Sequence, residues 1–97
     1  MQVVFHPRVY DDLAGIMAYS ERVATRELAD AFYVEFRHVA EEAGKRPTSF
    51  AIRERDIRRV DLRRFPYHLL FRIVGVSVRI LVVRHHRRHP SIGMRRA

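Results

Sequence analysis

The sequence contains no cysteine and no tryptophan. Without cysteine the chain can form no disulfide, no thiolate zinc site and no cysteine nucleophile, and this composition is compatible with a reducing cytoplasm. It also lacks the roughly 18 to 20 consecutive apolar residues that a membrane-spanning helix needs. Residues 1–5 lead into His6-Pro7 without the apolar core of a signal peptide. We therefore expect a soluble, cytoplasmic protein.

Motifs for several kinds of catalysis are missing as well. The four glycines stand singly, so no phosphate-cradling loop is present. No serine is flanked by glycines as in a nucleophile elbow. Neighbouring carboxylates such as Asp11 and Asp12 diverge by about 100° on a helix and do not form an acid and base pair. Nucleotide hydrolysis, serine catalysis and glycosidase chemistry are thus unsupported.

The length of the chain limits its architecture. A protein of 97 residues and 11.5 kDa can bury one hydrophobic core, with little left for a second domain. No internal repeat and no linker-like segment divides the sequence. We expect a single domain over residues 1–97, with a basic tail over about 86–97 and a shallow functional site.

The first half of the chain has the patterns of one strand and two helices. Residues 2–5 are mostly apolar and β-branched, which favours a strand. A helix over about 8–21 is predicted by the helical spacing of Val9, Tyr10, Leu13, Ile16 and Met17. Thr25 is a suitable N-cap for a second helix, which we expect over about 25–43 and which Gly44 ends. The short connection between them predicts an antiparallel helical hairpin.

The second half has a period closer to two residues, which is typical of strands. Residues 50–54 form a short extended piece, and longer strands are expected over 57–64, 67–74 and 77–85. In the last strand, Val78, Ile80 and Val82 alternate with Arg79, Leu81 and Val83. The tight turns between the strands predict an antiparallel meander. The expected fold is therefore α+β, in the order β-α-α-β-β-β, with the sheet packed against the helical hairpin. Its core should include the aromatic residues Phe32, Phe36, Phe65, Tyr67 and Phe71.

Charge is distributed unevenly along the chain. The net charge is +8, but residues 1–56 hold eight Lys and Arg against ten Asp and Glu, a balance of −2. Residues 57–97 hold eleven Arg against Asp61 alone, a balance of +10. A basic surface of this kind fits a polyanion such as nucleic acid, or an acidic protein partner.

Arginine and histidine gather on the last three strands and the tail. The set comprises Arg58, Arg59, Arg63, Arg64, His68, Arg72, Arg79, Arg84, His85, His86, Arg87, Arg88 and His89. Histidine can carry protons near neutral pH and arginine can offset charge on a phosphate, so the set permits RNA cleavage without a metal. A solvated basic face that only binds nucleic acid also explains the set, and from these residues alone we favour binding over cleavage. The spacing of His85, His86 and His89 does not predict a metal site, because no acidic or cysteine partner stands nearby in the sequence.

Three segments resemble the RelE/ParE superfamily of type II toxin–antitoxin toxins. They are FHPRVYDDLAGIMAY at 5–19, IRRVDLRRFPYHLLFRI at 57–73 and VRILVVRHHRRHP at 78–90. The resemblance runs from about Val3 to Pro90. It implies a β-α-α-β-β-β fold, a toxin that arrests growth, and a co-encoded antitoxin whose acidic or amphipathic segment wraps the toxin in a hetero-oligomer.

Members of the superfamily divide between two targets, ribosome-bound mRNA and DNA gyrase. For the nuclease branch, the resemblance implies catalytic roles for Arg64, His68, Arg84 and either His85 or His86. The arginines expected to bind nucleic acid are Arg63, Arg72, Arg79, Arg87 and Arg88. The sequence departs from the nuclease pattern because it has no strand lysine and no tyrosine after Tyr67.

We favour a ribosome-dependent mRNA endonuclease that uses no cofactor and no metal, in which His86 or His68 transfers protons and Arg64 and Arg84 hold the phosphate. The alternative is a ParE-like, non-enzymatic inhibitor of DNA gyrase. A second alternative is a small basic nucleic-acid-binding module. None of the three readings involves a membrane.

Overall fold

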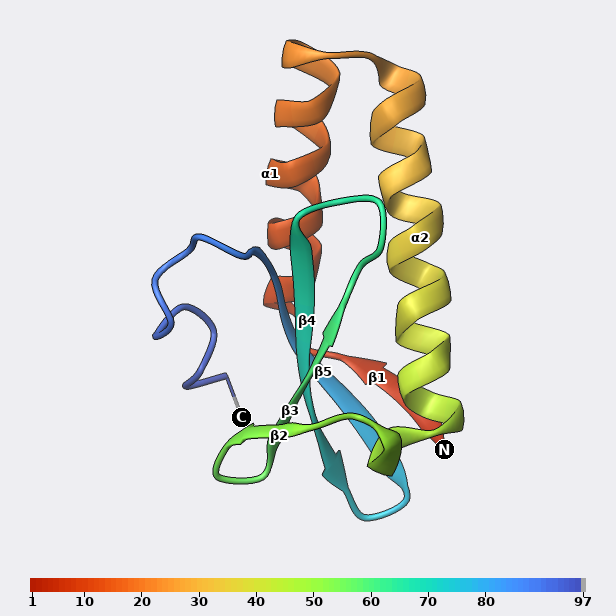
Figure 1. The fold of residues 1–97 in the computed structure, drawn as a ribbon, viewed down its shortest axis with the longest axis vertical. Helices are drawn as coiled ribbons and strands as arrows, with labels where there is room; N and C mark the ends of the chain where they lie inside the picture. Colours follow the sequence, from red (N-terminus) through yellow and green to blue (C-terminus); the bar gives the residue numbers. More distant parts are fainter. Residues whose placement is uncertain (97) are drawn as a thin grey trace.

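A computed structural model describes residues 1–96 and contains a five-stranded sheet and two helices (Figure 1). The elements follow in the order β1 (Gln2–Phe5), α1 (Arg8–Val23), α2 (Arg26–Lys45), a 3₁₀ turn (Pro47–Ser49), β2 (Ile52–Glu54), β3 (Ile57–Asp61), β4 (Tyr67–Val74) and β5 (Ser77–His85). Within the described chain, no helix is both long and apolar enough to cross a membrane. The predicted α+β order is confirmed, with β2 as an additional short strand.

The strand order across the sheet is β1-β5-β4-β3-β2. Strands β3, β4 and β5 form the predicted antiparallel meander. Strand β1 pairs with β5 in parallel, from Gln2 opposite Ser77 to Phe5 opposite Ile80. A parallel neighbour is possible here because the helical hairpin carries the chain away from β1 before the meander begins. The meander therefore lies between two short edge strands.

The helices form an antiparallel hairpin against one face of the sheet and project beyond it at one end (Figure 1). Thr25 caps α2 as predicted, since its Oγ1 accepts a hydrogen bond of 3.0 Å from the backbone N–H of Leu28. The aromatic residues predicted for the core lie in the cluster between helices and sheet, with Phe32 fully buried. Tyr10 was expected on the apolar stripe of α1 and is 63% exposed. The stripe is narrower than predicted because Val9, one residue earlier, occupies the buried position.

A β-bulge in β5 changes the predicted alternation of its side chains. Leu70 pairs with Val82 and Phe71 pairs with Ile80, so Leu81 is an extra residue in the ladder. Beyond the bulge, the side chains of β5 lie on the opposite faces of the sheet from those predicted. Val83 packs in the cluster under the helices, while Val82 lies with Leu81 on the other side. The expectation that Val82 shares a face with Ile80 is therefore wrong.

The face of the sheet opposite the helices, here called the outer face, is partly covered by the C-terminal tail. Ile92 and Met94 pack on a small cluster of Ile57, Leu70, Leu81 and Val82. At the end of the tail, the guanidinium of Arg96 pairs with the carboxylate of Asp12 in α1, at 2.5 and 3.1 Å. The tail thus forms no core of its own, as expected from its composition, but it is attached to the sheet. Ala97, the last residue of the predicted tail, lies outside the described residues.

Candidate functional site on the outer face

Three neighbouring strands place Asp61, His68 and Arg84 side by side on the outer face. In the ladder Asp61 lies opposite His68, and His68 lies opposite Arg84. Side chains alternate along a strand, so the packing of Leu69 under the helices directs His68 to the other face. One carboxylate, one imidazole and one guanidinium are therefore brought together by strand register.

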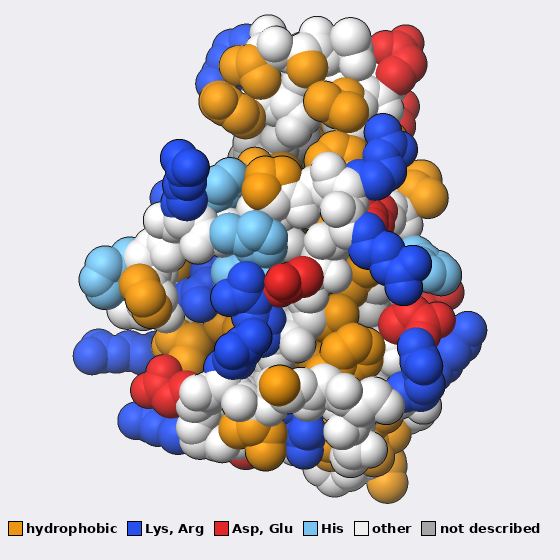
Figure 2. Space-filling view, in the orientation of Figure 1, with side chains coloured by type: hydrophobic (Ala, Val, Ile, Leu, Met, Phe, Trp, Pro, Cys, Tyr) orange, Lys and Arg blue, Asp and Glu red, His pale blue; other side chains and the backbone are white. Residues whose placement is uncertain are grey.

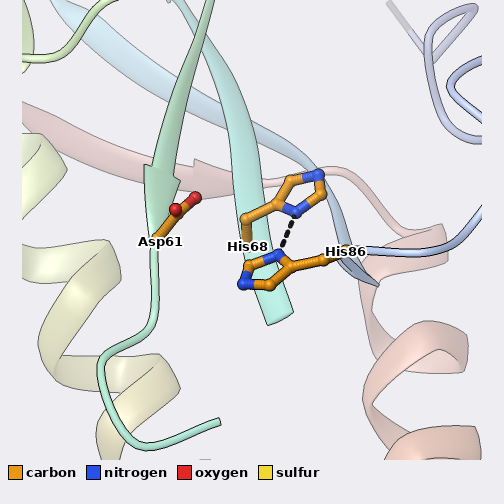
Figure 3. Close-up of side chains that lie close together, drawn as sticks. All are labelled: Asp61, His68 and His86. Carbon is orange, nitrogen blue, oxygen red and sulfur yellow. Dashed lines mark hydrogen bonds between the residues drawn. The ribbon is translucent and has the colours of Figure 1, made fainter. Parts of the chain in front are cut away.

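His86 joins this group from just beyond the end of β5. Its backbone N–H donates a hydrogen bond of 2.9 Å to the carbonyl oxygen of Pro66, which fixes the chain beside the turn between β3 and β4. The Nδ1 atoms of His68 and His86 are 2.9 Å apart (Figure 3). The two rings are nearly parallel, at 11°, with their centres 5.2 Å apart. His68 is 2% exposed, whereas His86 is exposed to solvent.

Arg84 connects the histidine pair to the tail. Its Nε–H donates a hydrogen bond of 2.9 Å to Nε2 of His68. Its Nη1 donates to the carbonyl oxygens of Pro90 and Ile92, at 2.8 and 2.7 Å. Burial, followed by the charge of Arg59, lowers the pKa of Arg84. Most of the donors that Arg84 was expected to offer to a phosphate are therefore used within the protein.

Arg59 is the second guanidinium of the site. Its Nε donates to Asp61 at 2.7 Å, and its Nη2 lies 3.3 Å from Nδ1 of His86. Burial alone would raise the pKa of Asp61, but the hydrogen bond and charge of Arg59 outweigh it, so this pKa lies below its usual value. Asp61 and Arg59 thus form an ion pair at the edge of the histidine pair.

The environment keeps His68 neutral. Burial lowers its pKa from 6.5 to about 4, and the nearby charges of Arg59 and Arg84 act in the same direction. At neutral pH a group with this pKa is almost entirely unprotonated. His68 is therefore poorly suited to donate a proton, and its burial keeps it from direct contact with a large substrate.

A shallow cavity of about 220 Å³ lies beside the histidine pair. Arg53, Arg59 and Arg84 line it, together with the carboxylate of Glu54 and apolar side chains that include Leu70 and Met94. Three guanidinium groups against one carboxylate leave the cavity positively charged, which favours an anion, and arginine's planar fork suits phosphate oxygens. Figure 2 shows histidine and arginine side chains gathered beside an acidic side chain on this side of the molecule.

Asp61, His68 and His86 also have the donor types of a metal site, because their ligand atoms all lie within 4.8 Å of one another. The hydrogen bonds of the site argue against that use. A metal on Nδ1 of His68 would require the proton on Nε2, where Arg84 already donates a hydrogen bond. The guanidinium groups of Arg59 and Arg84 would also repel a cation. The donor set therefore does not fit a metal ion.

The structure brings together only part of the predicted catalytic set. His68, Arg84 and His86 meet on the outer face, whereas Arg64 and His85 lie elsewhere. The guanidinium of Arg64 lies over the ring of Phe65, 5.4 Å from its centre. His85 makes an edge-on contact with Tyr67, with ring centres 5.0 Å apart, on the face that carries the helices.

The arginines predicted to bind nucleic acid are spread over several surfaces. Arg72 is paired with Asp56 at 2.8 Å, and Arg79 lies opposite Arg72 in the ladder. Arg63 lines a groove of about 520 Å³ between α2 and β3. Arg87 and Arg88 are exposed in the turn after β5.

Two residues of the site had no role in the sequence-based prediction. Arg59 belonged to the basic set without a particular function, and Asp61 was only the single acidic residue of its region. The hairpin between β3 and β4 is centred between Arg64 and Phe65, which pairs Asp61 with His68. A hairpin centred on the predicted Phe65-Pro66 turn would instead pair Asp61 with Leu70, so the sequence did not predict this register. Nothing in the sequence placed the ring of His86 against that of His68.

The strand order and the helical hairpin define an α+β fold with two helices packed on a five-stranded, mostly antiparallel sheet. A solved chain described as "Chromosomal ParDE TA system from P. aeruginosa" has this fold, with a TM-score of 0.78. The match covers 88% of this chain and 95% of that chain at 19% sequence identity. The predicted RelE/ParE-like fold is therefore confirmed. No family model matches the sequence, and no curated protein matches it.

Proposed function

We propose that this chain is the growth-arresting toxin of a type II toxin–antitoxin pair and that the outer face is its active surface. The fold supports the class, and the balance of +10 over residues 57–97 supports a polyanionic or acidic target. A cognate antitoxin with an acidic or amphipathic segment would neutralise the same basic surface. Such a pair would form a hetero-oligomer.

The favoured activity is cleavage of ribosome-bound mRNA without a metal. The observation that carries it is the exposed ring of His86, held by buried His68 next to the guanidinium of Arg59. RNA cleavage needs a group that takes the proton of the 2′-hydroxyl or protonates the leaving 5′-oxygen, and imidazole does this near neutral pH. Arg59 and the adjacent cavity would hold the scissile phosphate and offset its developing charge.

The roles that we propose for the residues of the outer-face site differ from those predicted from the sequence. His86 is the proton carrier because it alone of the pair is exposed. His68 holds His86 in place, and Arg84 holds His68. Arg59 takes the phosphate contact that was first assigned to Arg64 and Arg84.

The second candidate is a ParE-like inhibitor of DNA gyrase, which needs no proton transfer. It is favoured by the contacts of Nδ1 of His86 with His68 and Arg59, which occupy one of the two ring nitrogens that proton transfer could use. In this reading, the basic face around His86 binds gyrase as an extended surface, with no particular role for the His86 ring.

Induction of the protein without its operon partner separates the two activities. Incorporation of labelled amino acids and thymidine is followed for several minutes, and mRNA 5′ ends are mapped by primer extension. Early loss of protein synthesis with new cuts within codons supports the nuclease. Intact mRNA with early loss of DNA synthesis and an SOS response supports gyrase inhibition and refutes the nuclease.

Matched variants test the site itself. His86→Ala and Arg59→Gln should abolish mRNA cuts, whereas His38→Gln, at an exposed position on α2, should leave them unchanged. A gyrase inhibitor should tolerate His86→Ala much better. Normal growth on induction, together with salt-dependent binding to naked DNA or RNA, would refute both toxin activities and indicate a nucleic-acid-binding module.

A further inference from the structure

A continuous series of hydrogen bonds runs from the tail to the exposed histidine. It begins at the carbonyl oxygens of Pro90 and Ile92, passes through Arg84 to His68, and ends at His86. A guanidinium can only donate hydrogen bonds, so this series has a direction. The direction determines which ring nitrogens carry protons.

The proton positions follow step by step from Arg84. Because Arg84 donates to Nε2 of His68, that nitrogen must carry a lone pair. Neutral His68 then has its single proton on Nδ1, which lies 2.9 Å from Nδ1 of His86. Nδ1 of His86 is therefore the acceptor, and the proton of His86 is on Nε2. The approach of Arg59 Nη2 to the same Nδ1, at 3.3 Å, agrees with this result because Arg59 can only donate.

We propose that Arg84 is a positioning residue that sets the tautomers of both histidines, so that His86 presents an N–H donor to solvent. In this state Nε2 of His86 can bind a phosphate oxygen but cannot accept a proton from a substrate. Protonation of His86, or a shift of its proton to Nδ1, requires Arg84 to leave His68. The consequence for RNA cleavage rests on the proposed nuclease function, whereas the tautomers do not depend on it.

The tail holds Arg84 in this role. The carbonyl oxygens of Pro90 and Ile92 in the tail accept hydrogen bonds from Nη1 of Arg84. The far end of the tail is attached to α1 through the ion pair of Arg96 with Asp12. Gly93 has a φ of +83°, and a Cβ there would lie 2.5 Å from Val82, so the backbone packs closely on the sheet. A phosphate in the neighbouring cavity, which Arg84 lines, would compete with these contacts. Anion binding and release of the histidine pair are thus coupled through one side chain.

The test is an ¹⁵N NMR experiment on the full chain, with His68 and His86 assigned from His68→Gln and His86→Gln spectra. Long-range ¹⁵N–¹H spectra report which ring nitrogen carries the proton. We expect Nδ1–H at His68 and Nε2–H at His86. We also expect ¹⁵N–¹⁵N coupling through the hydrogen bonds from Arg84 to His68 and from His68 to His86. A proton on Nε2 of His68, or absence of both couplings, would overturn the proposal without any variant.

Variants then show that Arg84 is the cause. Arg84→Leu should make the Nε2–H form of His68 appear beside the Nδ1–H form, because the remaining donation from Arg59 favours a lone pair on Nδ1 of His86 but does not reach Nε2 of His68. Arg84→Lys, which retains a donor, should keep the wild-type pattern. Arg26→Leu, at an exposed position at the start of α2, is the matched control. Unchanged tautomers in folded Arg84→Leu would refute the role of Arg84. If Arg84→Leu does not fold, the couplings in the wild-type protein decide.

Adding phosphate or Zn²⁺ to the protein separates this proposal from metal binding and from the nuclease function. Inorganic phosphate should shift the resonances of Arg84 and Arg59 and weaken the coupling between Arg84 and His68. Added Zn²⁺ should leave both tautomers unchanged, since coordination through the two Nδ1 atoms would contradict the inferred protons. A protein that cuts no mRNA but shows the expected tautomers would refute the nuclease and leave the positioning role of Arg84 intact.

Discussion

Acidification from about pH 7 to pH 5 should destabilise this protein through His68, the one buried titratable residue in the part of the chain that the structure describes. His68 is 2% exposed, and its pKa in the folded protein is about 4, compared with 6.5 in the unfolded chain. The folded state therefore favours the neutral ring. Between these two pKa values the unfolded chain binds a proton that the folded protein does not, so stability falls as the pH falls.

The size of the effect follows from the same two values. One unit of pKa difference corresponds to about 1.36 kcal/mol, and the range from pH 6.5 to 5 covers about 1.5 units. The expected loss is about 2 kcal/mol, a measurable share of the roughly 5 to 15 kcal/mol that stabilises a typical domain. The loss should be complete only below pH 4, where His68 is protonated in the folded protein as well. The carboxyl groups with lowered pKa values, Glu42, Asp56 and Asp61, start from 4.5, 3.8 and 3.8 and contribute mainly at lower pH.

Urea unfolding followed by circular dichroism at about pH 7, 6 and 5 measures this loss. The matched variant is His68→Gln, whose amide offers an acceptor to Arg84 and a donor to His86 but does not titrate. The wild-type protein should lose about 2 kcal/mol more than this variant across the range. His38→Gln should retain the wild-type dependence. Equal slopes in the wild-type protein and His68→Gln would show that His68 is not held neutral by its surroundings.

Three further substitutions test the packing that supports the site. Phe32→Ala should lower the free energy of unfolding by about 3 to 5 kcal/mol, because Phe32 is fully buried between the rings of Phe65 and Tyr67; a loss below about 1 kcal/mol in urea unfolding would contradict that burial. Thr25→Ala should cost about 1 kcal/mol through loss of the α2 cap, with Thr25→Ser restoring most of it in the same assay. Gly93→Ala should release the tail, because the added Cβ would collide with Val82, and faster amide exchange over residues 86–96 measures this; unchanged exchange would show that the tail does not depend on this close contact.

The regular elements could be predicted because their signals are local. The apolar spacing and the Thr25 cap define α2, which exceeds its predicted range by two residues at the C-terminal end. The turns at Phe65-Pro66 and Gly75-Val76 delimit β4, whose bounds were predicted correctly. The face of Val82 was not predictable in this way, because the bulge depends on how β5 pairs with β4.

The sequence by itself determined the fold class, the concentration of arginine after residue 57 and the presence of histidines able to carry protons. Only the tertiary structure decided which of these residues act together. His68 and His86 are 18 residues apart, and their contact depends on strand register and on the backbone bond from His86 to Pro66. The same packing buries His68 and holds Arg84 in hydrogen bonds to the tail. It also separates Arg64 and His85 from the pair of His68 and His86. Protonation and hydrogen bonding depend on burial and on distance in space, and neither quantity is a local property of the chain.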